Sequence, residues 1–85
     1  MSAANQGSAV RAVVEVLARA LTDRPDEVHV RESGHESTTL VELFVGSGEL
    51  GRVIGKQGRT ARAMRNLLGA AGLKFHKRYT LEILE

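Results

Sequence analysis

The segment Gly55-Lys56-Gln57-Gly58 combines two glycines with polar and cationic residues, and Arg59 follows it directly. Glycine at both ends lets the backbone turn sharply and approach a phosphate without side-chain obstruction. A helix starting at Arg59 would point its free N–H groups and the positive end of its dipole at the same spot. The spacing therefore predicts a loop that binds a phosphate-bearing ligand.

The cations around this loop are in an unfavourable local position. Arg52, Lys56 and Arg59 lie near the expected helix N-terminus, where each positive charge opposes the helix dipole by about 0.3–1 kcal/mol. A local rule that is broken without visible compensation is often the mark of a functional site. An anionic ligand would supply that compensation.

Two other phosphate-binding motifs overlap the same glycines, and their spacing excludes both. The stretch Gly46–Gly51 fits G-x-G-x-x-G, but no acidic residue lies between Glu49 and Glu82 and the chain is too short for a doubly wound sheet. A Walker loop requires glycine where this chain has Leu50, and Ser or Thr where it has Gln57. A nucleotide-cofactor loop is therefore not expected.

Charge is distributed unevenly along the 85 residues, although the net charge is only +2. Residues 50–81 contain eight basic residues and no acidic one, whereas residues 1–49 contain four basic and eight acidic residues. Such a block attracts polyanions, although a solvated basic face is the plainer interpretation.

Other kinds of site find no support in the composition. There is no cysteine, and the three histidines lack metal-ligand spacing, so we expect no metal, no cofactor and no catalytic residue. No apolar run reaches the length of a membrane span, and the first residues do not resemble an export signal. We therefore expect a cytoplasmic protein.

Hydrophobic periodicity predicts one small domain over residues 8–85, after a flexible tail at 1–7. Ser8 is the expected N-cap of the first helix and Gly72 the expected C-cap residue of the last one. The expected order is helix 9–21, strand 28–32, turn 33–37, strand 38–45, short helix 50–54, helix 59–71 and strand 79–84.

Three finer expectations concern the placement of side chains. In the first helix, we expect Val13 and Leu21 on the buried face and Thr22 on the exposed one. Apolar residues on both faces of strand 38–45 indicate a central strand or a partner contact. On the last helix, Arg65 is expected to be solvated.

The segment Val53 to Arg59 is typical of KH domains, whose GXXG loop clamps about four nucleotides by their backbone. Together with His76-Lys77-Arg78, the undecapeptide Gly51–Ala61 closely resembles the KhpA family of small bacterial single-KH proteins. The resemblance implies an α+β, type II KH fold of order α-β-β-α-α-β, with a three-stranded sheet and three helices packed on one face.

The same resemblance implies a non-enzymatic RNA chaperone or post-transcriptional regulator that binds single-stranded RNA with low sequence specificity. Single-stranded DNA stays open as a ligand. Val53 and Ile54 would form the floor of the base groove or belong to the core. The residues that would carry the binding are Gly55, Lys56, Gln57, Gly58, Arg59, Arg62, Arg52, Val53 and Ile54.

A single KH domain contacts few nucleotides, so pairing would raise its useful affinity. The resemblance implies a homodimer, or a heterodimer with a larger KhpB-type protein (also called Jag or EloR). Phe44 or Leu40, or the Ala63–Leu67 surface, would supply the contact. The alternative function is an assembly subunit in which RNA contact is secondary.

Overall fold

The computed structural model describes residues 3–85, including the side chains of residues 9–34 and 36–85. The predicted element order α-β-β-α-α-β is confirmed, with two additional turns of 3-10 helix at Pro25–Glu27 and Lys56–Gly58. The helices and strands are α1 Ala3–Leu21, β1 His29–His35, β2 Thr38–Phe44, α2 Leu50–Ile54, α3 Arg59–Phe75 and β3 Arg78–Leu84.

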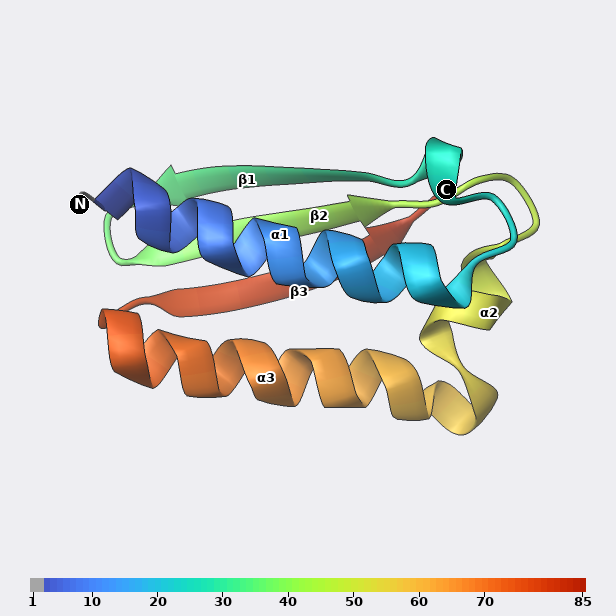
Figure 1. The fold of residues 1–85 in the computed structure, drawn as a ribbon. Helices are drawn as coiled ribbons and strands as arrows, with labels where there is room; N and C mark the ends of the chain where they lie inside the picture. Colours follow the sequence, from blue (N-terminus) through green and yellow to red (C-terminus); the bar gives the residue numbers. More distant parts are fainter. Residues whose placement is uncertain (1–2) are drawn as a thin grey trace.

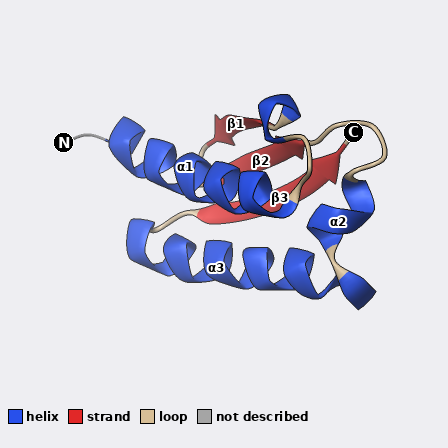
Figure 2. Ribbon diagram, turned by 45° about the vertical axis from the view of Figure 1, so that its right-hand side comes forward, coloured by secondary structure: helices blue, strands red, loops and turns tan. Residues whose placement is uncertain are grey.

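The three strands form one mixed sheet in the order β1-β2-β3. β1 pairs antiparallel with β2, and β3 pairs parallel with β2, so that Val41 lies between Glu32 and Leu81. β2 is thus the central strand, as its two apolar faces indicated. Both α1 and α3 lie side by side along one face of this sheet, and α2 lies at one end of the helix layer (Figures 1 and 2).

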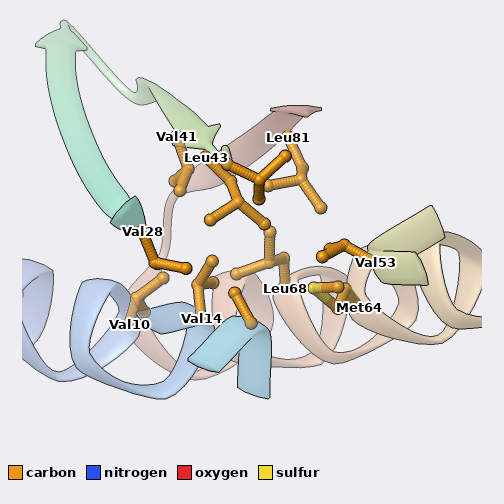
Figure 3. Packing of buried hydrophobic residues seen from close by; sticks show 11 residues of the cluster. Val10, Val14, Val28, Val41, Leu43, Val53, Met64, Leu68 and Leu81 are labelled. Atoms are coloured by element: carbon orange, nitrogen blue, oxygen red, sulfur yellow. The ribbon is translucent and has the colours of Figure 1, made fainter. Parts of the chain in front are cut away.

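The core lies between the helices and the sheet (Figure 3). Val41 and Leu43 of β2 are fully buried, because alternate residues of a strand point to the same face. Around them lie apolar side chains from α1, α2, α3 and β3 and from the residues next to β1 and β2, namely Val10, Val14, Ala18, Val28, Val45, Val53, Met64, Leu68 and Leu81.

Helix α1 differs from its predicted form at both ends. It begins at Ala3, so Ser8 lies inside the helix rather than at its N-cap. Residues 3–7 are helical; their flexibility stays a prediction, and Met1 and Ser2 lie outside the described residues. The buried stripe is also narrower than expected: Val13 is 50% and Leu21 38% exposed, whereas Thr22 is buried by a contact described below.

The hairpin between β1 and β2 is tighter than the predicted five-residue turn. β1 continues to His35, and Glu36 turns the chain with a φ of 59°. Ser33 and Gly34 pair with Leu40 and Thr39. An edge strand exposed on one side accepts such polar residues, since its pairing depends on the backbone.

Helix α3 is one turn longer than predicted, and Gly72 is not its C-cap. The helix continues to Phe75, and His76 takes the left-handed conformation with a φ of 58°. The Lys77 N–H donates to the Gly72 carbonyl at 3.0 Å. Gly72 is buried inside the helix, where a β-carbon would collide with the Lys77 carbonyl oxygen. Close backbone approach explains this glycine.

Two polar atoms are buried on the helix-covered side of the sheet without a hydrogen-bond partner among the described residues, Glu32 Oε2 and the Tyr79 hydroxyl. Burial raises the pKa of Glu32, although Arg11 and Lys77 act in the opposite direction. Burial, followed by the nearby Glu32 carboxylate, also raises the pKa of Tyr79. None of the helices in the described chain is long and apolar enough to cross a membrane.

Candidate nucleic-acid interface

The glycine loop forms the joint between α2 and α3. Gly55 ends α2 with φ 84° and ψ 168°, Gln57 has a φ of 57°, and Gly58 caps α3 with φ 74° and ψ 15°. Three positive φ values in four residues produce a sharp turn that few side chains tolerate. This turn leads directly into α3, whose first N–H groups have no partner within the helix.

The two glycines of the loop are required for different reasons. A β-carbon on Gly55 would lie 3.0 Å from the Thr60 nitrogen and would collide with the Thr60 side chain. A β-carbon on Gly58 would meet nothing within 4 Å. Gly55 is therefore fixed by internal packing. Gly58 leaves open space over the start of α3, into which a ligand can approach the backbone.

The loop is held in shape by the arginines of α3. Arg59 Nη2 donates to Gln57 Oε1 at 3.3 Å, and Arg62 Nη2 donates to the Gln57 carbonyl oxygen at 3.3 Å. Across the described part of the chain, Lys56, Arg59 and Arg62 form no ion pair. The positive charge at this helix end has no carboxylate to balance it, as the sequence suggested for Lys56 and Arg59.

The prediction of an uncompensated cation is wrong for Arg52, because carboxylates of the protein itself balance its charge. Its guanidinium pairs with Asp23 Oδ2 at 3.0 Å and with Glu49 Oε2 at 3.6 Å. These contacts direct Arg52 to the end of α1, so its role in binding stays a prediction and its main visible role is to position α2.

Glu49 joins the end of α1 to the start of α2, and the sequence pattern did not predict this role. Its carboxylate accepts hydrogen bonds from Thr22 Oγ1 at 2.6 Å and from the Asp23 N–H at 2.7 Å. These two hydrogen bonds hold the pKa of Glu49 below its ordinary value, and Arg52 acts in the same direction. The end of α1 is thereby fixed to the residue that precedes α2, which in turn carries the glycine loop.

A cavity of about 460 Å³ lies beside the loop, between α3 and β3. It is lined by Ile54, Gly58, Ala61, Arg62, Arg65 and Ile83. Val53 is fully buried in the core, so only Ile54 of the two predicted floor residues reaches this cavity. Ile83 was not anticipated; the alternation of β3 shows which face it occupies, but not that the face adjoins the loop.

Arg65 is exposed, as predicted, and it also contacts the sheet. Its Nη2 donates to the Leu81 carbonyl oxygen at 3.2 Å. β3 is an edge strand whose outer peptide groups have no neighbouring strand, and Arg65 binds one of them. The cavity therefore has a floor of apolar side chains and walls of guanidinium and peptide groups, a combination that suits a flat polar ring attached to an anionic backbone.

No group of three or more His, Cys, Asp or Glu residues is close enough to hold a metal ion within the described chain. The predicted site residues Gly55, Lys56, Gln57, Gly58 and Arg59 are contiguous, and Arg62 and Ile54 lie beside them. Their part in binding is a prediction that geometry alone does not test.

Comparison with known proteins places this geometry in a family. The family model described as "KhpA/KhpB, KH domain" matches residues 11–83. A protein named RNA-binding protein KhpA from Aquifex aeolicus (strain VF5) is 53% identical over 78 residues, covering 92% of this chain and 99% of that protein. One of the same name from Clostridium perfringens (strain 13 / Type A) is 41% identical over 75 residues, covering 88% of this chain and all of that protein.

Among solved structures, Era in complex with MgGDPNP and nucleotides 1506–1542 of 16S ribosomal RNA matches with a TM-score of 0.58 at 17% identity. The match covers 88% of this chain and 29% of the Era chain, and it shows a shared fold. The family model spans most of the chain, and the relatives match it along almost their full length. This chain therefore belongs to the KhpA/KhpB family of KH domains.

Proposed function

We propose that this protein binds single-stranded RNA by clamping its backbone at Gly55–Gly58, and that it acts as an RNA chaperone or post-transcriptional regulator. The observation that carries the proposal is the open backbone over Gly58 at the N-terminus of α3, beside three cations that form no ion pair with any described residue. The relatives' shared name, RNA-binding protein KhpA, supports the choice of ligand.

Each part of the site has a separate task in this proposal. The N–H groups of Gly58 and Arg59 donate to the Gly55 and Lys56 carbonyl oxygens, so the remaining N–H groups of the loop and of the first turn of α3 donate to a phosphate. Lys56, Arg59 and Arg62 add positive charge. A base enters the cavity between Ile54 and Ile83. Because that cavity is lined by no aromatic side chain, stacking is weak, backbone charge dominates the affinity and sequence specificity is low.

The proposal includes no catalysis, cofactor or metal, and it places the protein in the cytoplasm with its RNA. Single-stranded DNA can bind through the same contacts, since none of the proposed contacts involves a 2′-hydroxyl group. Competition between RNA and DNA oligomers of one sequence measures that preference.

As protein partner we propose a second copy of this chain or a KhpB-type protein. An apolar groove of about 250 Å³ between α1 and α3 supports a protein contact, and it is lined by Ala9, Val10, Val13, Leu67, Leu68, Ala71 and Phe75. Leu67 belongs to the Ala63–Leu67 surface named above, whereas Phe44 and Leu40 are half-buried on the uncovered face of the sheet. The same groove favours the alternative function, in which the protein is an assembly subunit and its contact with RNA is secondary.

The double variant Lys56→Asp/Gln57→Asp tests the clamp. It adds negative charge where the phosphate would lie, so binding to a short single-stranded RNA should fall by at least about tenfold. The matched control Asn66→Asp/Lys74→Asp makes the same change in net charge at exposed positions of α3 away from the loop. Wild-type affinity in the loop variant, measured by fluorescence anisotropy, would refute the clamp.

The salt dependence of the same binding reaction distinguishes a backbone clamp from an apolar contact. About three phosphate contacts predict a slope near −2 for the logarithm of affinity against the logarithm of salt concentration. A flat response would leave the assembly alternative as the better account.

A further inference from the structure

A second cavity lies along the same side of α3 as the one beside the loop. Its volume is about 490 Å³, and its lining includes Gly69, Gly72, His76, Lys77, Arg78 and Tyr79. The α3 residues that line the two cavities recur every three or four positions, from Gly58 through Arg62, Arg65, Gly69 and Gly72. Side chains with that spacing share one face of a helix. Both cavities therefore lie along one face of α3, beside β3, and we call this strip of surface the α3–β3 groove.

Arg65 lines the first cavity and donates to the Leu81 carbonyl oxygen of β3. The neighbouring bonds Val45 N–H to Leu84 oxygen and Arg78 N–H to Ser37 oxygen show that the even-numbered residues of β3 face β2. Tyr79, Leu81 and Ile83 therefore direct their peptide groups to the outer edge, since neighbouring peptide groups of a strand alternate in direction. The wall of the α3–β3 groove thus offers hydrogen-bonding groups along its length.

The glycine at position 69 has no structural explanation within the fold. It is exposed in the middle of α3, and a β-carbon there would meet nothing within 4 Å. Glycine weakens a helix relative to alanine. Gly72 is needed for the approach of the Lys77 carbonyl, but no such contact exists at Gly69. The effect of Gly69 is to leave the second cavity open on the helix side.

The charge at this end of the groove matches that at the loop. Lys77 and Arg78 line the second cavity, and neither forms an ion pair within the described residues. Ala61 and Gly72, which line the two cavities, lie eleven residues apart, or about 16 Å along the helix axis. A single strand held at the loop would need to span this distance along the edge of β3 to reach the second cavity.

We propose that the second cavity is a further nucleotide subsite, in which a base lies over Gly69 and Gly72 while Lys77 and Arg78 attract the adjoining phosphate. This subsite rests on the proposed function and extends it, because the strand clamped at Gly55–Gly58 continues along the α3–β3 groove. The protein then recognises a longer segment than the roughly four nucleotides that a KH loop clamps.

Oligomer length is the test. Single-stranded RNAs of about four and about eight nucleotides, each with a fluorescent label, are titrated with the full chain. The wild type should bind the longer oligomer roughly tenfold more tightly. Gly69→Leu fills the cavity and should reduce the affinity for the longer oligomer to that for the shorter one. Ala70→Leu, at the adjacent exposed position, is the matched control and should change neither affinity.

A second variant guards against misfolding of the first. Lys77→Gln/Arg78→Gln removes two charges while keeping side-chain size, and it should weaken only the longer oligomer. Equal binding of both lengths by the wild type, or equal weakening of both by each variant, would overturn the subsite. If neither oligomer binds the wild type, the clamp fails as well; if the shorter one binds and the longer gains nothing, only the subsite fails.

Discussion

The two sides of α3 have opposite characters. The side toward the β3 edge carries Arg62 and Arg65 together with Gly69 and exposed peptide groups. The side toward α1 is apolar, and Leu67, one of its residues, is 53% exposed. One helix thus separates a surface suited to a polyanion from a surface suited to another protein. The proposed RNA and partner contacts therefore need not compete for the same surface.

This separation has a consequence for affinity. If the apolar side joins two protein chains, the two α3–β3 grooves remain free, and two linked sites bind one RNA more tightly without any new contact. Charged residues are also kept away from the apolar side, which avoids the desolvation that a buried unpaired charge would cost.

The largest effect is expected at the loop that begins the polar side. Gly55→Ala forces a side chain into a positive φ and against Thr60, and should lower the free energy of unfolding by about 3 kcal/mol. In Gly58→Ala the only strain comes from the positive φ, and the free energy of unfolding should fall by about 1 kcal/mol. Urea denaturation measures both values, and equal losses would show that the two glycines are not constrained differently.

An intermediate effect should separate the two sides of the helix. Arg62→Ala should weaken RNA binding about tenfold, or roughly 1.4 kcal/mol, because it removes a charge beside the loop. Leu67→Asp should abolish any self-association or partner binding. It should leave the affinity for a short RNA, which occupies one site only, within about twofold. Light scattering gives the molar mass and anisotropy gives the affinity. If Leu67→Asp weakens RNA binding as much as Arg62→Ala does, the two sides are not independent.

The smallest effect concerns the contact that positions α2. The pKa of Glu49 is lowered in the folded protein, so its ionised form stabilises the fold above its unfolded pKa. That contribution is lost as the pH falls through the lowered folded pKa. Glu49→Gln should therefore reduce stability at neutral pH and flatten the acid limb of a stability-against-pH curve. An unchanged acid limb would mean that Thr22, Asp23 and Arg52 do not hold α2 through this carboxylate.

The sequence predicts those parts of the molecule that depend on local pattern. The element order, the central position of β2 and the joint at Gly55–Gly58 follow from alternation, helical spacing and glycine placement. The contacts that pattern does not reveal join distant segments. Thr22 and Glu49 are 27 positions apart, and Arg65 and Leu81 are 16 apart. Which residues meet there depends on how α1 and α3 lie on the sheet.

The same limit explains the errors at single residues. Gly72 has the spacing of a C-cap, but the return of the chain at Lys77 makes it a packing glycine inside a longer helix. Arg52 resembles a free cation in the basic block, but Asp23 and Glu49 reach it from an earlier part of the chain. Sequence periodicity shows on which face of an element a side chain lies, but it does not show which distant residues contact that face.

We propose that single-stranded RNA contacts the β3 side of α3, starting at the glycine loop. Titration of the isotope-labelled protein with a short single-stranded RNA, followed by amide chemical shifts, tests it most directly. We expect the largest changes at Lys56, Gly58 and Arg62, and none at Val13 and Leu67 on the α1 side. Changes centred on Val13 and Leu67, with the loop unaffected, would contradict it.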